Sequence, residues 1–284
     1  MAKDKKKSAR IRLVVQILFF LVVTLIVTAH NLVEIGVEIP LIGSASIHSI
    51  CPFGGVVSIY EFFVSGSFVK KIHESSFILM AIVFLLSLLA GPVFCGWVCP
   101  FGSFQEWIAK LGKKIFKKRF NHFIPYKIDK YLRFLRYVVL VWVIYMTATS
   151  GQLLFQNIDP FYTLFNFYTS EMAISGYIVF GVIVVLGFFV ERPFCKYACP
   201  YGALLGIFNL FRLFGIKRNA ATCIDCKACD KICPMNIPIS DKSTIRNHQC
   251  ITCMKCSSEQ SCPVPDTLNL EAGKAKKEAK DDAA

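Results

Sequence analysis

The sequence predicts an all-α membrane protein with four transmembrane helices in two pseudo-repeats, followed by a small cysteine-rich domain near the C-terminus. Three observations predict this fold. Four apolar stretches are long enough to be membrane helices, a cysteine motif recurs in the two halves, and eight of the 13 cysteines lie in one short polar segment. The composition agrees, because 55% of the residues are hydrophobic and 18% are charged, whereas soluble domains contain about 25% charged residues.

The four apolar stretches predict the helices that cross the membrane. A helix of about 20 residues spans the hydrocarbon core, and four such stretches in one chain are not expected of a soluble protein. The first stretch does not resemble a cleaved signal, because no small-residue cleavage site follows Ala29. The predicted spans are approximately 13–29, 77–94, 134–149 and 174–190.

The formal charge of +13 indicates a membrane surface rather than nucleic acid, because the basic residues flank the apolar stretches. The N-terminus and the loop between the second and third spans are rich in Lys and Arg, whereas the loop between the third and fourth spans contains neither. The positive-inside rule then places both termini and the middle loop in the cytoplasm. We therefore expect a multi-pass protein of the bacterial cytoplasmic (inner) membrane, with lipid but no nucleic acid as a partner.

A repeat relates the two halves of the chain. Residues 94–102 read FCGWVCPFG and residues 194–202 read FCKYACPYG, while upstream ICPF at 50–53 parallels IDPF at 158–161. Each repeat runs from an outer loop through one span to the cytoplasmic side. Because both have this same direction, a pseudo-twofold axis along the membrane normal should relate them and bring the two motifs together. Each proline disfavours helical geometry at the preceding Cys99 or Cys199, and each motif is therefore predicted to turn as the chain leaves the membrane.

The motif cysteines allow three interpretations. Four thiolates are the right number for one 4Fe–4S cluster, which would be a third cluster in this chain. The alternatives are redox-active thiols and a structural role in packing. The four residues are Cys95, Cys99, Cys195 and Cys199.

The C-terminal segment carries the most specific motif. Its first group, from Cys223, reads Cys-x2-Cys-x2-Cys-x3-Cys-Pro, which is the bacterial ferredoxin pattern for 4Fe–4S clusters. The second group, from Cys250, repeats it with a last gap of five residues. Zinc sites normally use separated cysteine pairs, and cytoplasmic segments rarely hold disulfides. In two-cluster proteins the last cysteine of each group ligates the other cluster. Iron of cluster one is then bound by Cys223, Cys226, Cys229 and Cys262, and iron of cluster two by Cys250, Cys253, Cys256 and Cys233.

These motifs divide the chain into four parts. Residues 1–12 form a basic cytoplasmic N-terminus, and residues 13–216 form the transmembrane domain with both Cys-x3-Cys-Pro motifs. Residues 217–266 form a ferredoxin-like domain with two 4Fe–4S clusters, and residues 267–284 form a charged tail that we expect to be disordered.

Beyond the cysteine motifs, the sequence offers little sign of haem or nucleotide binding and a few polar residues in the outer loops. No Cys-x-x-Cys-His motif for covalent haem and no Gly-rich nucleotide motif occurs in the sequence. His48, Cys51 and Asp159 are polar features of the predicted outer loops, and they form a speculative outer-face site. The sequence identifies no catalytic residue.

At these motifs the sequence resembles the NapH-type family of membrane ferredoxins, which supplies electrons to periplasmic nitrate reductase. The resemblance extends from about residue 10 to 265 and includes relatives in nitrous oxide reduction, methylamine oxidation and cytochrome oxidase biogenesis. It implies quinol oxidation, with electrons passing through iron–sulfur clusters to a ferredoxin- or cytochrome-type partner. The sequence departs from the pattern in the long last ferredoxin gap, and Cys51 stands where the second repeat has Asp159.

The leading prediction is therefore an iron–sulfur electron-transfer protein between the quinone pool and a partner redox protein, the quinol dehydrogenase subunit of an anaerobic respiratory system. Four spans exceed what an anchor needs, which favours a lipid-soluble quinone as donor or acceptor. One alternative is an assembly or maturation factor that reduces a metal or thiol in another protein. Another is a scaffold that docks a peripheral electron-transfer subunit.

Overall fold

The computed structural model describes residues 2–34, 74–150, 155, 158–167, 173–259, 261–264 and 266–273. His48 and Cys51 of the predicted outer-face site lie outside these residues, as does the upstream part of the first repeat. The predictions at those positions therefore stay predictions.

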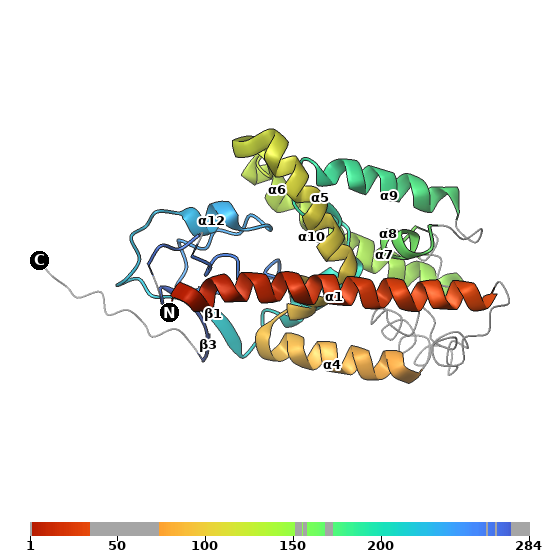
Figure 1. Ribbon diagram of the computed structural model, residues 1–284, viewed down its shortest axis with the longest axis horizontal. Helices are drawn as coiled ribbons and strands as arrows, with labels where there is room; N and C mark the ends of the chain where they lie inside the picture. Colours follow the sequence, from red (N-terminus) through yellow and green to blue (C-terminus); the bar gives the residue numbers. More distant parts are fainter. Residues whose placement is uncertain are drawn as a thin grey trace, which may run out of the picture.

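Four apolar helices run along the long axis of the molecule, with the cysteine-rich segment at one end (Figure 1). Each helix covers most or all of a predicted apolar stretch, and α4 ends at Ala90, two residues before Pro92. Helices α4 and α9 lie along opposite long edges. The four helices are α1 (Ala2–Glu34), α4 (Glu74–Ala90), α7 (Leu135–Ser150) and α9 (Ile174–Gly187).

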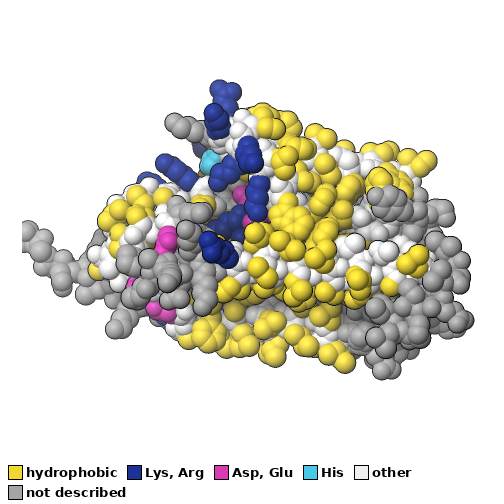
Figure 2. All heavy atoms as spheres, in the orientation of Figure 1, with side chains coloured by type: hydrophobic (Ala, Val, Ile, Leu, Met, Phe, Trp, Pro, Cys, Tyr) yellow, Lys and Arg dark blue, Asp and Glu magenta, His cyan; other side chains and the backbone are white. Residues whose placement is uncertain are grey.

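Among the described residues, one helix is long and apolar enough to cross a membrane, over Ala9–Leu32 of α1. The apolar segments Ile78–Ala90 and Ile174–Gly187 are shorter. All four helices nevertheless expose large apolar side chains, which Figure 2 shows as a wide hydrophobic surface. Water would not favour such a surface, whereas lipid would. Examples are Leu25 on α1, Ile82 on α4, Val141 on α7 and Val182 on α9.

The two repeats adopt the same local structure. In the first, α4 leads through the π-helical turn η1 (Phe94–Val98) into α5 (Pro100–Phe116). In the second, α9 leads through α10 (Pro193–Tyr197) into α11 (Pro200–Phe208). Cys99 and Cys199 have ψ angles of 114° and 112°, and the following proline occupies the first turn of the next helix. The turn predicted at each Cys-Pro is therefore confirmed.

The C-terminal segment folds around a three-stranded antiparallel sheet with strand order β2-β1-β3. Ile216 of β1 pairs with Ile245 of β2 and Leu270 of β3. The strands are β1 (Phe214–Arg218), β2 (Thr244–Ile245) and β3 (Leu268–Ala272), and the remaining short helices are η2 (Lys117–Arg119), α6 (Tyr126–Leu132), α8 (Pro160–Phe165) and α12 (Ala228–Ile232).

The sheet corrects two sequence-based expectations. The chain is mostly helical rather than all-α, and residues 268–272 form a strand within the tail that we expected to be disordered. The physical reason is long-range pairing, because Leu268 is buried beside the core residue Ile216. The iron–sulfur segment, as we call it below, therefore comprises residues 214–272.

The iron–sulfur segment packs against the Cys-x3-Cys-Pro motifs. Its buried core also contacts Cys95 and Cys195, one cysteine from each repeat. The core consists of Ile216, Cys233, Met235, Ile237, Ile239, Ile245, Cys250, Ile251, Cys256 and Leu268. The segment is thus docked on the helical domain rather than tethered to it by a linker.

Candidate iron–sulfur sites

The first site lies at the end of the iron–sulfur segment. One pocket is lined by all four cysteines predicted for cluster one, and we call this set site 1. Asp225 and Lys227 adopt positive φ angles of 48° and 54°, which let the loop curl around the pocket. The cysteines of site 1 are Cys223, Cys226, Cys229 and Cys262, of which Cys226 is exposed.

A second pocket gathers the four cysteines predicted for cluster two, and this set is site 2. The pocket is otherwise apolar, with Ile, Met and Pro side chains. Cys233 from the first group reaches across to the second group, as the crossed arrangement requires. Burial raises the pKa of Cys233 to about 12. The cysteines of site 2 are Cys233, Cys250, Cys253 and Cys256.

The two repeats bring a third set of thiols together, which we call the motif site. Cys99, Cys195 and Cys199 line an apolar cavity of about 140 Å³, and Cys95 and Cys199 pack against the same core of Tyr201 and its neighbours. Matched residues of the two repeats line this cavity, as a pseudo-twofold axis requires: Phe94 and Phe194, Cys99 and Cys199, Pro100 and Pro200, and Phe101 and Tyr201.

The chemistry of the motif site fits a thiolate-bound cluster. The backbone N–H of Gly202 donates to Cys199 Sγ at 3.2 Å, and Gln105 Nε2 donates to Cys195 Sγ at 3.5 Å. Such N–H···S hydrogen bonds stabilise charge on cluster thiolates. Burial raises the pKa of Cys99 to about 12, and a bound metal would favour its thiolate form. In the described part of the chain, no three His, Cys, Asp or Glu side chains gather closely enough to hold a single metal ion.

Asp159 lies in the same cavity as the motif cysteines. It caps α8 and accepts a hydrogen bond from the Phe161 backbone N–H at 3.1 Å. Burial raises the pKa of this carboxyl to about 7. The structure thus places the one described residue of the predicted outer-face site beside the motif site.

Direct contacts join the motif site to site 2. Trp97 Nε1, between the two cysteines of the first motif, donates to the Thr252 carbonyl at 3.1 Å. Thr252 Oγ1 in turn donates to the Ala90 carbonyl at the end of α4, at 3.0 Å. A Cβ atom at Gly96 would lie 2.4 Å from the Ile251 carbonyl. The peptide that follows Cys250 therefore lies directly against the first motif.

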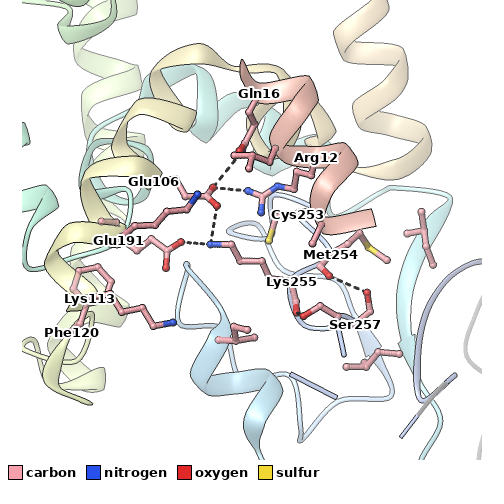
Figure 3. A pocket seen from close by; sticks show the side chains of 18 of the residues that line it. Arg12, Gln16, Glu106, Lys113, Phe120, Glu191, Cys253, Met254, Lys255 and Ser257 are labelled. Atoms are coloured by element: carbon pink, nitrogen blue, oxygen red, sulfur yellow. Dashed lines mark hydrogen bonds and ion pairs between the residues drawn. The ribbon is translucent and has the colours of Figure 1, made fainter. Parts of the chain in front are cut away.

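A buried ionic network holds the iron–sulfur segment against the helical domain, at a contact region that we call the junction. Figure 3 shows part of this network. Glu106 on α5 accepts from Arg12 at 2.6 Å and Arg192 at 2.8 Å, and pairs with Lys255 at 3.1 Å. Lys255 also pairs with Glu191. Burial alone would raise the pKa of Glu106, but Arg192, Lys255 and Arg12 hold it well below its usual range. The network joins α1, α5 and the iron–sulfur segment.

A second network forms on the other side of the second motif. Asp129 accepts from Arg133 and Tyr197, and Lys196 pairs with it at 2.7 Å. Arg133 also donates to the Asn236 carbonyl of the iron–sulfur segment at 3.0 Å. From the sequence, Arg12 and Arg133 counted only as signals of membrane topology, whereas the structure buries both. For Arg133 the available signal was Asp129, four residues earlier, whereas the partner of Arg12 lies 94 residues away and no local pattern points to it.

A cavity of about 440 Å³ opens beside the first network (Figure 3). It lies between α1, α5 and the iron–sulfur segment, and Cys253 of site 2 forms part of its wall. Lys110 and Lys113 line the same cavity. Cys253 and Met254 therefore line both this cavity and the pocket of site 2.

The fold and sites define a class of protein: an iron–sulfur protein whose cysteine-rich segment is docked on apolar helices. The family described as a 4Fe-4S binding domain matches residues 72–119 and 172–219, which contain the two Cys-x3-Cys-Pro motifs. The chain belongs to the NapH-type family of 4Fe–4S membrane proteins.

Three relatives illustrate the similarity. YccM of Escherichia coli (strain K12) is 31% identical over 229 residues, which cover 78% of this chain and 63% of YccM. "Uncharacterized protein MJ0750" of Methanocaldococcus jannaschii is 34% identical over 209 residues, which cover 74% of this chain and 82% of that protein. "Ferredoxin-type protein NapH" of E. coli is 28% identical over 192 residues, which cover 62% of this chain and 61% of NapH. No solved structure matches the chain.

Proposed function

We propose that this protein passes electrons between the membrane quinone pool and a partner redox protein, as a quinol dehydrogenase subunit. The observation that supports this proposal most strongly is the spatial order of the three cysteine sets. The motif site adjoins an apolar cavity among the membrane helices, site 2 packs against the motif site, and site 1 ends in the exposed Cys226. This order describes a path from lipid to solvent.

The path requires a helical domain immersed in lipid. We propose that α1, α4, α7 and α9 all enter the membrane, because each exposes apolar side chains that lipid would cover. The shorter helices would be accommodated by local thinning of the bilayer. Both termini and the iron–sulfur segment would lie in the cytoplasm of a bacterial inner membrane, in agreement with the basic loops.

The apolar cavity at the motif site would let the ring of a quinol approach the bound cluster. Phe19 and Val23 of α1 and Phe161 of α8 line it with their apolar side chains, and Asp159 is its carboxyl group. Quinol oxidation releases two protons and two electrons. A partly desolvated carboxylate with a pKa near neutrality is suited to accept a proton at physiological pH. The aromatic side chains would exclude water while the electrons leave.

The thiolates hold the electron carriers. When bound, 4Fe–4S clusters supply one-electron redox chemistry, which separates the two electrons of a quinol. We propose that the motif site, site 2 and site 1 each hold one cluster through their four cysteines. Desolvation raises the pKa of Cys95 and Cys199 well above the usual range. This favours a cluster over thiol exchange with another protein, because exchange requires a thiolate.

The partner protein would dock at site 1. Ile224 lies between two cysteines of this site and is 63% exposed, and its neighbour Cys226 is also exposed. An exposed apolar residue beside a redox centre suits the small, transient interface of an electron-transfer complex.

The test is reduction of the purified, iron-loaded protein by a short-chain quinol under anaerobic conditions. Loss of visible iron–sulfur absorbance should follow quinol addition, and an excess of the matching quinone should restore it. Complete failure of every ubiquinol and menaquinol analogue to exchange electrons with a cluster-loaded sample would contradict the proposal.

A further inference from the structure

Buried positive charge exceeds buried negative charge at the junction of the helical domain and the iron–sulfur segment. In the described part of the chain, the buried cations outnumber the buried carboxylates. Uncompensated charge is costly in a low-dielectric interior. The cations are Arg12, Arg133, Arg136, Arg192, Lys196 and Arg212, and the carboxylates are Glu106 and Asp129.

Arg192 occupies the centre of this junction. Its Nη1 donates to the Cys95 carbonyl at 2.5 Å, and its Nη2 donates to Glu106 at 2.8 Å. Burial alone would lower the pKa of Arg192, but Glu106, Cys195 and Cys253 raise it. Arg192 contacts the motif site through the Cys95 carbonyl, and Glu106 joins it to Lys255, two residues after Cys253 of site 2.

Two further observations set Arg192 apart from a structural arginine. Its side chain is fully buried, and its Nε has no hydrogen-bond partner among the described residues. Its φ angle of +54° lies in the left-handed region, which is uncommon for a residue other than Gly. Strained backbone of this kind concentrates at functional sites.

Arg136 and Arg212 repeat the pattern on either side. Each is buried, and the hydrogen bonds found for each join it to neutral groups. The Nε of each also lacks a partner in the described structure. Arg212 Nη1 lies 3.9 Å from Cys250 Sγ of site 2, and Arg136 acts electrostatically on Cys95 and Cys195 of the motif site.

We propose that Arg192 is a positioning residue that sets the reduction potential of the motif site and of site 2, and that the negative charge of Glu106 partly offsets its effect. The proposal rests on the proposed function in one respect, namely that the motif thiols hold a cluster. Reduction adds negative charge to a cluster, and a fixed buried cation stabilises that charge. Arg192 therefore raises both potentials, while Glu106 opposes it.

The two residues give opposite predictions. Arg192→Gln should lower the potential of the motif cluster, and Glu106→Gln should raise it, because three cations then face the sites without their shared carboxylate. We expect each change to shift the one-electron equilibrium about tenfold, which corresponds to about 59 mV. Arg192→Lys keeps the charge and should shift the potential less than Arg192→Gln. Lys114→Gln removes an exposed charge from the same helix as Glu106 and should leave both potentials unchanged.

The measurement is an EPR-monitored redox titration of the holoprotein, with the motif cluster identified as the signal that Cys195→Ser removes. Unshifted potentials in both Arg192→Gln and Glu106→Gln, or shifts of the same sign, would overturn the proposal. If Arg192→Gln does not load iron, the sign of the Glu106→Gln shift decides alone. An iron content of about eight per wild-type chain would show that the motif site holds no cluster. The proposal is then tested by the shift in the potential of site 2 in the same two variants.

Discussion

At the residue scale, the motif site is distinguished by polar groups placed in an apolar cavity. Gln105 and the Gly202 N–H donate to its sulfurs, and Asp159 provides a carboxyl with a pKa raised to about 7. The sequence indicated Asp159 because it stands in the repeat where the first half has Cys51. It gave no reason to select Gln105, Glu106 or Arg192, because their importance arises from long-range contacts between the repeats.

Asp159→Asn tests the proton acceptor. The carboxylate must be ionised to accept a proton, so wild-type quinol oxidation should rise as the pH increases through about 7. The variant should be slower by about 10²-fold and should lose this rise. The other titratable groups in the cavity are Cys99, Cys195, Cys199 and Tyr201.

The rate is read from stopped-flow reduction of the clusters by a quinol between pH 5.5 and 8.5. Asp225→Asn, at an exposed carboxylate of site 1, should keep the wild-type profile. A wild-type pH profile in Asp159→Asn would remove Asp159 from the mechanism.

At the scale of elements, the two Cys-Pro turns were predictable and the docking of the iron–sulfur segment was not. Proline constrains the residue before it, so the extended ψ of Cys99 and Cys199 followed from sequence alone. The paired residues of β1 and β3 lie 50 to 58 positions apart in the chain, and no local pattern specifies such a pair. The charged composition of the tail concealed the alternation of Leu268 and Leu270.

Gly96→Ala tests the contact between the first motif and site 2. Its Cβ would lie 2.4 Å from the Ile251 carbonyl, so the motif and the iron–sulfur segment must separate. We expect a loss of about 1–3 kcal/mol in stability, seen as a lower midpoint of thermal unfolding in detergent and as slower electron transfer from the motif site to site 2.

Gly181→Ala is the matched control, since a Cβ at Gly181 of α9 would meet nothing within 4 Å. It should match or slightly exceed the wild-type midpoint, because Ala favours a helix over Gly. Equal midpoints for wild type and Gly96→Ala would show that the segments are not packed as described.

At the scale of the whole molecule, the helical domain and the iron–sulfur segment depend on different forces. The helices follow from apolar sequence and were predictable. The segment holds eight cysteines in two pockets around a small core, and metal ligation contributes directly to the folding of such domains. Exposed apolar surface covers much of the helical domain, while Lys and Arg gather near the junction (Figure 2).

Removal of iron should therefore unfold one part selectively. After chelation under reducing conditions, limited proteolysis should cut within residues 214–272, while the far-UV circular dichroism keeps most of its helical signal. Holoprotein treated identically is the control. A segment that stays protected without iron would mean that the buried ionic networks and core hold it without clusters.

The central claim is that three sets of four cysteines hold three clusters in series between the membrane and the solvent. Iron and acid-labile sulfide per chain, measured on anaerobically purified protein, test it most directly. The account predicts about twelve of each per chain, falling to about eight in Cys195→Ser. A wild-type value of about eight, unchanged in Cys195→Ser, would contradict it, because the motif site would then hold no cluster and the path from the quinol would be broken.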